Sequence, residues 1–122
     1  MNENTNIPVY DLEERTFQFA KNVRIWVKSL PKTIANVEDI KQLIRASGSV
    51  GANYIEANES LSKKDFVFRI KICKKEAKES GYWIRLILES NDNIVEEKNG
   101  KLLLQESIEL KKIFSSIEGK SK

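Results

Sequence analysis

The chain has 122 residues, of which 40% are hydrophobic and 32% are charged, and its formal net charge is +3. These values predict one globular domain over residues 1–122 and exclude a disordered or fibrous chain. With no histidine and one cysteine, histidine-based catalysis is excluded, a zinc site is nearly excluded, and a reducing cytoplasmic setting is expected.

The first predicted helix covers about residues 11–30. Asp11 and Glu14 fit a capping box, and Pro31 supplies the stop. The core-facing positions alternate in steps of four and three residues, at Leu12, Thr16, Phe19, Val23, Trp26 and Leu30. Such a stripe indicates an amphipathic helix.

The second and third predicted helices cover about residues 37–59 and 63–90. Asn36 is the expected N-cap of the second helix, and Ser62 is the expected N-cap of the third. Both helices continue the same stepping of apolar positions. Each therefore has one face for a shared core.

The fourth predicted helix covers about residues 96–118 and ends at Gly119. Asn99-Gly100 lies either inside its first turn or just before it. No segment alternates with the period of two that a strand requires. Four amphipathic helices joined by short links predict an all-α, antiparallel up-down-up-down four-helix bundle.

Two glycines, Gly48 and Gly51, lie in the stretch RASGSVGANYIEAN within the second helix. A phosphate-binding loop would need a preceding strand and a recognised glycine motif, and neither is present. Glycine inside a helix costs roughly 1 kcal/mol relative to alanine. We therefore interpret Gly48 and Gly51 as a thin helix face against which another helix packs closely, with a kink as the alternative.

Positive charge concentrates on the third helix, which carries eight basic and four acidic side chains. At 100° per residue most of the lysines share one face, and one tyrosine projects from the same side. The candidate nucleic-acid-binding residues are Lys64, Lys71, Lys74, Lys75, Lys78, Arg85 and Tyr82. This pattern fits a phosphate-binding surface, and it equally fits an ordinary solvated helix face.

Several polar residues are assigned a structural role. Asn53 and Glu56 are expected in a hydrogen-bond network at the end of the second helix, with a ligand or partner site as the alternative. Glu76 and Glu79 are expected to pair with Arg45 or Arg15 from other helices. No nucleophile or metal ligand is recognisable beside these carboxylates.

Short elements follow one another in a distinctive order over about residues 10–118. They are Leu12-Glu13-Glu14-Arg15, Phe19-Ala20, Leu30-Pro31, Gln42-Leu43, Arg45-Ala46-Ser47, the run SVGANYIEA from Ser49 to Ala57, Lys75-Glu76-Ala77, Glu79-Ser80, Tyr82-Trp83, Glu106, Glu109-Leu110 and Ile113. In this order they resemble the four-helix-bundle proteins encoded within intervening sequences of bacterial 23S rRNA genes. A more distant similarity is to the accessory variability proteins of diversity-generating retroelements.

The resemblance implies a ring-like homopentamer with no catalytic residue, and a nucleic-acid-binding role is proposed for family members. We therefore expect a non-enzymatic pentamer that binds RNA or DNA. No cofactor or small-molecule substrate is evident from the sequence, and no membrane association is expected, because no stretch approaches the roughly 18 uninterrupted apolar residues of a membrane span. A protein–protein scaffold or regulatory partner is the alternative. An enzyme is a third interpretation, and it would require a catalytic pocket lined by Glu56 and Glu76.

Overall fold

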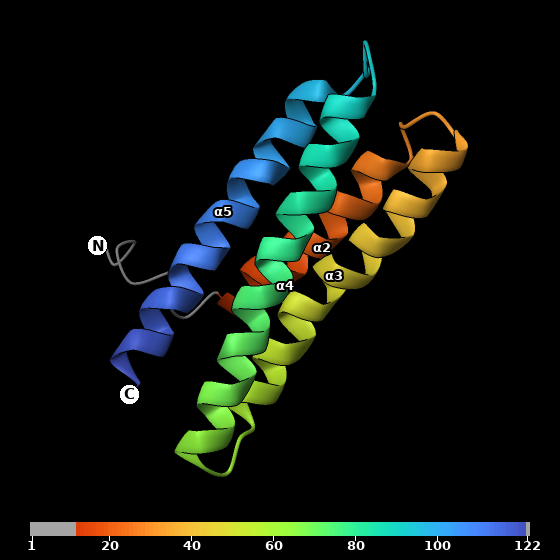
Figure 1. Ribbon diagram of the computed structural model, residues 1–122. Coiled ribbons are helices and arrows are strands. Elements are labelled where there is room, and N and C mark those ends of the chain that lie inside the picture. The colour runs from red at the N-terminus through yellow and green to blue at the C-terminus, as the bar shows by residue number, and fades with distance from the viewer. Residues whose placement is uncertain (1–11, 122) are drawn as a thin grey trace.

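The computed structural model describes residues 12–121, which form four α-helices and no strand. In chain order these helices are α2 (Leu12–Val27), α3 (Ile34–Asn58), α4 (Lys63–Ser90) and α5 (Glu97–Lys120). Successive helices run in opposite directions (Figure 1). The prediction of an all-α four-helix bundle is therefore confirmed.

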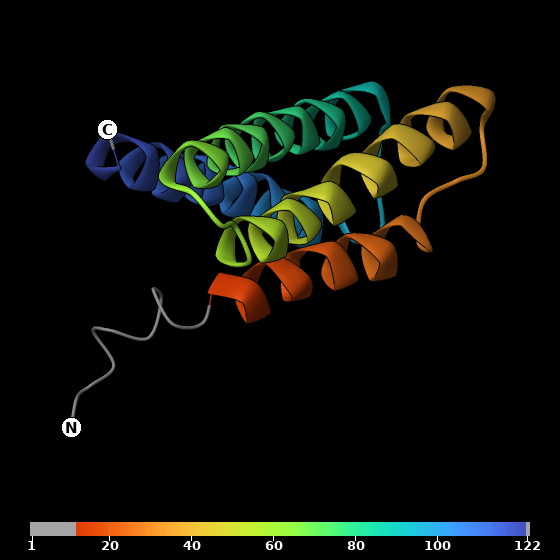
Figure 2. The same cartoon turned by 90° about the horizontal axis from the view of Figure 1, so that it is seen from below.

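The four helices contact one another unequally. The most extensive contacts join α4 to α3 and to α5, and the smallest helix–helix contact is between α2 and α5. Seen from below, α2 and α4 lie on opposite sides of the bundle (Figure 2). The outer face of α4 is therefore free of any other helix in the described chain. None of the helices over residues 12–121 is long and apolar enough to span a membrane.

The hydrophobic core lies along the axis between the helices and follows the stepping seen in the sequence. Leu12, Thr16, Phe19, Val23 and Trp26 of α2 are all buried. They pack with apolar side chains of the other three helices, among them the fully buried Leu43, Ile84, Leu110 and Phe114. Burial of each such large side chain contributes about 1.5–3 kcal/mol to folding.

Two helices begin at a hydroxyl N-cap, one at the predicted residue and the other three residues before it. Ser62 caps α4 as predicted, because its Oγ accepts a hydrogen bond from the Asp65 amide at 3.1 Å. The N-cap of α3 is Thr33 rather than Asn36, and Thr33 Oγ1 accepts from the Asn36 amide at 3.1 Å. Asn36 instead lies buried in the first turn of the helix, where its side chain serves a tertiary contact. The predicted cap at Asp11 lies outside the described residues.

The two glycines of α3 face α2, and they face polar rather than aromatic neighbours. A Cβ placed on Gly51 would lie 2.9 Å from Thr16 Oγ1 and 3.2 Å from Thr16 Cβ. A Cβ on Gly48 would meet only the guanidinium of Arg24, at 3.3 Å. The close helix approach is therefore concentrated at Gly51.

Gly100 has the tightest surroundings of any glycine in the described chain. It lies inside α5, where an added Cβ would come within 2.5 Å of the Trp26 ring and 2.8 Å of Leu88 Cδ2. Because Gly100 has no side chain, the Trp26 ring can pack here, and its Nε1 donates to the Glu96 carbonyl at 3.0 Å. Gly119, the predicted end of the fourth helix, is itself helical, since α5 continues to Lys120.

Candidate nucleic-acid interface

Four of the predicted basic residues form a row along the outer face of α4. Lys64, Lys71, Lys75 and Lys78 are all exposed. None of these four forms a salt bridge with another residue of the described chain. We call them the lysine row. Their charges are available to solvent or to an anionic partner.

The other two predicted basic residues are engaged in ion pairs. Lys74 is half-buried and points toward α5, where its Nζ lies 2.7 Å from Glu118 Oε1. Arg85 is exposed and pairs with Glu89 one turn later on α4, with 2.8 Å between Nε and Oε2. Lys74 therefore holds two helices together, whereas Arg85 stays at the surface beside the lysine row.

Tyr82 extends the lysine row toward the end of α4. Its side chain is 60% exposed, and its ring meets Trp83 edge-on, with 4.9 Å between the ring centroids. Trp83 is half-buried and donates its Nε1 hydrogen to Glu79 Oε2 at 3.0 Å. The exposed Tyr82 side chain therefore packs against Trp83, which is held in place by its hydrogen bond to Glu79.

The carboxylates of Glu76 and Glu79 belong to an ion-pair cluster between α3 and α4. Arg45 reaches both, with 3.4 Å to Glu76 Oε1 and 2.5 Å to Glu79 Oε2. The hydrogen bond from Trp83, followed by the contact with Arg45, lowers the pKa of Glu79 below its ordinary value. A carboxylate held ionised in this way joins helices and is a poor proton donor.

Arg15, the other predicted partner of these carboxylates, pairs elsewhere. It forms a two-point contact with Glu106 of α5, at 2.7 Å and 2.9 Å. This hydrogen bond raises the pKa of Arg15 further above its ordinary value. The pair connects α2 and α5 along the most open seam of the bundle.

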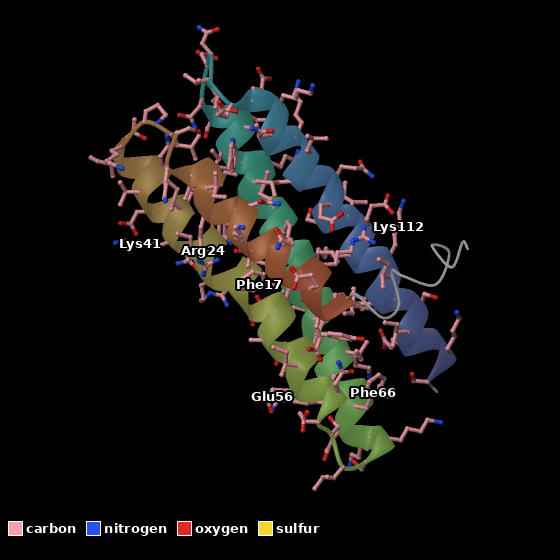
Figure 3. All side chains as sticks on the ribbon, turned by 180° about the vertical axis from the view of Figure 1, so that it is seen from behind. Phe17, Arg24, Lys41, Glu56, Phe66 and Lys112 are labelled. Carbon is pink, nitrogen blue, oxygen red and sulfur yellow. The ribbon has the colours of Figure 1, made fainter. Side chains whose placement is uncertain are left out.

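Asn53 and Glu56 have different surroundings at the C-terminal part of α3. Asn53 is half-buried, donates to the Ser49 carbonyl and hydroxyl at 2.9 Å each, and accepts from Arg69 Nη1 at 2.9 Å. Glu56 is exposed and lies toward the opposite end of α3 from Lys41 (Figure 3). Asn53 thus links α3 to α4, and Glu56 is a surface residue within this chain.

The carboxylates of Glu56 and Glu76 do not come together. Glu76 pairs with Arg45, which precedes Glu56 on α3 by a separation of roughly 16 Å along the helix axis. The two residues therefore cannot line one catalytic pocket in this fold. Among the described residues, no cluster of three or more potential metal ligands is present.

Phe68 is a surface residue that the sequence did not single out. Its side chain is 59% exposed and lies on the outer face of α4 between Lys64 and Lys71. The helical periodicity indicates this exposed position, because residue 68 falls in the same alternation of four and three steps as the lysine row. The residue type indicates the opposite, because an aromatic residue on an amphipathic helix is ordinarily buried in the core.

Comparison with known proteins places the chain in context. A family model described as 23S rRNA-intervening sequence protein matches residues 10–116. A comparison with curated protein sequences finds no significant match. A similar solved structure is a protein of unknown function from the S23 ribosomal protein family of Bacteroides thetaiotaomicron VPI-5482, with a TM-score of 0.76 and 27% identity. The match covers 87% of this chain and 96% of that one.

Proposed function

The chain belongs to the family of 23S rRNA-intervening sequence proteins, and we propose that it is a non-enzymatic homopentamer that binds RNA or DNA through the outer face of α4. The observation that carries the nucleic-acid role is the lysine row. Four exposed cations without a salt-bridge partner in the described chain form an electrostatic surface for phosphates. Each further copy in a ring would add the same four charges. We further propose that it acts in the cytoplasm.

The proposal of a pentamer rests on the resemblance to the family, and exposed apolar side chains support self-association. Phe17 and Ile25 of α2 and Leu102 of α5 are each more than half exposed. The last two line a groove of about 700 Å³ along the α2–α5 seam, and Figure 3 shows Phe17 and Arg24 along α2. Exposed apolar surface of this kind marks an interaction site, and the occupant we propose is a second copy of this chain.

The test of the nucleic-acid role is a triple variant, Lys71→Glu, Lys75→Glu and Lys78→Glu. In filter-binding titrations across a salt series, we expect weaker binding and a salt slope reduced by about 2, since each lost contact with a single strand removes about 0.7. The control is Lys98→Glu, Lys111→Glu and Lys112→Glu on α5, which makes the same change in net charge at exposed positions. Equal binding by wild type and the α4 variant would reject the proposal.

The test of the oligomer is light scattering at micromolar concentration. We expect the mass of five chains of 14.1 kDa each, and we expect Ile25→Glu with Leu102→Glu to reduce it. A monomeric wild type would reject self-association. The α2–α5 groove would then favour the second candidate function, a scaffold that binds a different protein in that groove.

A further inference from the structure

The outer face of α4 carries aromatic rings in register with the lysine row. The six positions 64, 68, 71, 75, 78 and 82 alternate in steps of four and three residues. At 100° per residue their side chains fall within a sector of about 80°. Phe68 and Tyr82 therefore belong to the same surface as the lysines.

Each of the two aromatic residues has a basic residue about one turn away on both sides. Phe68 lies between Lys64 and Lys71, and Tyr82 lies between Lys78 and Arg85. The rings are 59% and 60% exposed, although burial of such surface is favourable. An exposed ring with cations on either side fits a ligand that alternates flat apolar groups with negative charges.

A hollow lies directly beside Phe68. It measures about 500 Å³ and is lined by Lys63, Lys64, Val67, Phe68, Lys71 and Ser121. The hollow is shallow and open to solvent, and its volume is enough for a nucleobase laid against the ring. Phe68 and Val67 supply apolar wall, and three lysine side chains supply positive charge.

The guanidinium group of the neighbouring residue Arg69 lies near the Phe68 ring. The guanidinium carbon of Arg69 lies 6.0 Å from the ring centroid of Phe68. Arg69 is in turn held by Asn53 Oδ1 of α3 at 2.9 Å. The contact between Arg69 and the ring lies at the outer limit of a cation–π interaction, and it places a further positively charged group next to the Phe68 ring.

We propose that this face of α4 binds single-stranded nucleic acid, with one base stacked on Phe68 in the hollow and another on Tyr82. Lys71, Lys75 and Lys78 contact the phosphates between the two stacked bases, which would be about 21 Å apart along the helix. A duplex exposes only base edges in its grooves, so its bases cannot stack on these rings. This inference rests on the proposed nucleic-acid role and specifies the form of the ligand.

The test compares Phe68→Leu with Ile34→Ala as a control that also removes exposed apolar surface. Ile34 is 88% exposed and lies at the start of α3, outside the lysine row and outside the α2–α5 groove. The probes are a 20-nucleotide oligouridylate, the oligodeoxythymidylate of the same length, and a mixed-sequence RNA duplex of 20 base pairs. Filter-binding titrations are performed at several salt concentrations, and light scattering is measured for each variant.

We expect wild type to bind both single strands more tightly than the duplex. Phe68→Leu should lower the affinity for single strands by about tenfold, the typical effect of losing one stacked base, and leave the salt slope unchanged. Ile34→Ala should leave single-strand binding unchanged, and Tyr82→Leu should repeat the effect of Phe68→Leu.

Four outcomes would overturn the inference in distinguishable ways. If binding depends on the lysines but not on Phe68 or Tyr82, or if the duplex binds as tightly as the single strands, only the single-strand inference fails. If wild type binds none of the probes, the proposed nucleic-acid role fails as well. If Phe68→Leu changes the oligomeric mass, Phe68 is a subunit contact rather than a stacking site.

Discussion

Asn36 and Asn91 form a reciprocal pair, in which the side-chain Nδ2 of each donates to the Oδ1 of the other at 2.9 Å. Asn36 Nδ2 also donates to the Pro31 carbonyl at 2.9 Å, and Asn91 Nδ2 donates to the Ile87 carbonyl at 2.8 Å. The pair joins the start of α3 to the residue that follows α4. It is a specific polar contact at the end of the bundle where the α2–α3 and α4–α5 links meet.

Replacing Asn36 with alanine should destabilise the fold by about 1–3 kcal/mol, because Asn36 is buried and its loss removes the hydrogen bonds that it makes with the Asn91 side chain and the Pro31 carbonyl. Urea denaturation measures the effect, and the double variant with Asn91→Ala should show non-additivity of at least about 0.5 kcal/mol. The exposed Asn99 is the control, since Asn99→Ala should change stability by less than about 0.5 kcal/mol. Strict additivity would contradict the role of the pair.

Replacing Gly51 with leucine should be severely destabilising, by about 3 kcal/mol or more, because even its Cβ would clash with Thr16. Thr16 cannot easily move, since it is fully buried and its Oγ1 donates to the carbonyls of Leu12 and Glu13. The control is Gly119→Ala, where no atom lies within 4 Å of an added Cβ. Thermal unfolding measures both, and tolerance of leucine at Gly51 would contradict the close contact between helices.

Two adjacent lysines on α4 should have separate effects. Lys74→Ala should cost about 1–2 kcal/mol in urea denaturation, because the Glu118 carboxylate loses a charged partner. Its effect on the salt slope of RNA binding should be negligible. Lys75→Ala should do the reverse, with a salt slope lower by about 0.7 and little change in stability. Equivalent behaviour of the two variants would contradict this division.

Because the pKa of Glu79 is lowered in the folded state, the free energy of unfolding should depend on pH in the acidic range. The ionised carboxylate stabilises the fold above the ordinary glutamate pKa of 4.5, and that contribution is lost as the pH falls through the lower pKa of the folded state. Trp83→Phe removes the principal hydrogen bond and should raise the pKa of Glu79. The stability gap between wild type and this variant should therefore be larger at pH 7 than at pH 3. An equal gap at the two pH values would contradict this assignment.

Cys73 should be unreactive while the chain is folded. Burial raises the pKa of its thiol to about 12, and the side chain is fully buried in the core. A thiol-reactive disulfide reagent at pH 8 should therefore label the protein only after urea unfolds it. Because the unfolded thiol ionises at a lower pH than the folded one, stability should also decline as the pH rises above about 9. Rapid labelling of native protein would contradict the burial.

The helices could be predicted from the sequence because the apolar stepping is local, as the buried series from Leu12 to Trp26 illustrates. The N-cap of α3 could not, since Thr33 and Asn36 are both suitable caps by residue type. The side-chain amide of Asn36 is instead hydrogen-bonded to Asn91, which lies 55 residues away in the chain. This contact leaves Thr33 as the N-cap. A tertiary contact of this kind leaves no trace in the local pattern.

Part of the candidate interface could also be predicted from the sequence. The helical periodicity grouped the lysine row correctly on one exposed face, because exposure follows from that periodicity. It could not show that Lys74 reaches Glu118 of α5, since that pair requires the register between two helices. Phe68 was missed for the opposite reason, because its residue type suggested burial and its position on the helix indicated exposure.

The placement of the two tryptophans gives the protein two separate intrinsic fluorescence probes. Trp26 is buried at the α2–α5 seam against Gly100, and its emission should report on the packing of α2. Trp83 is half-buried beside Tyr82 and hydrogen-bonded to Glu79, close to the proposed ligand surface. A Trp83→Phe chain would follow folding through Trp26 alone, and a Trp26→Phe chain would follow events at α4. Opening of the seam and occupation of the α4 face can therefore be observed separately, in two single-tryptophan variants and without any attached label.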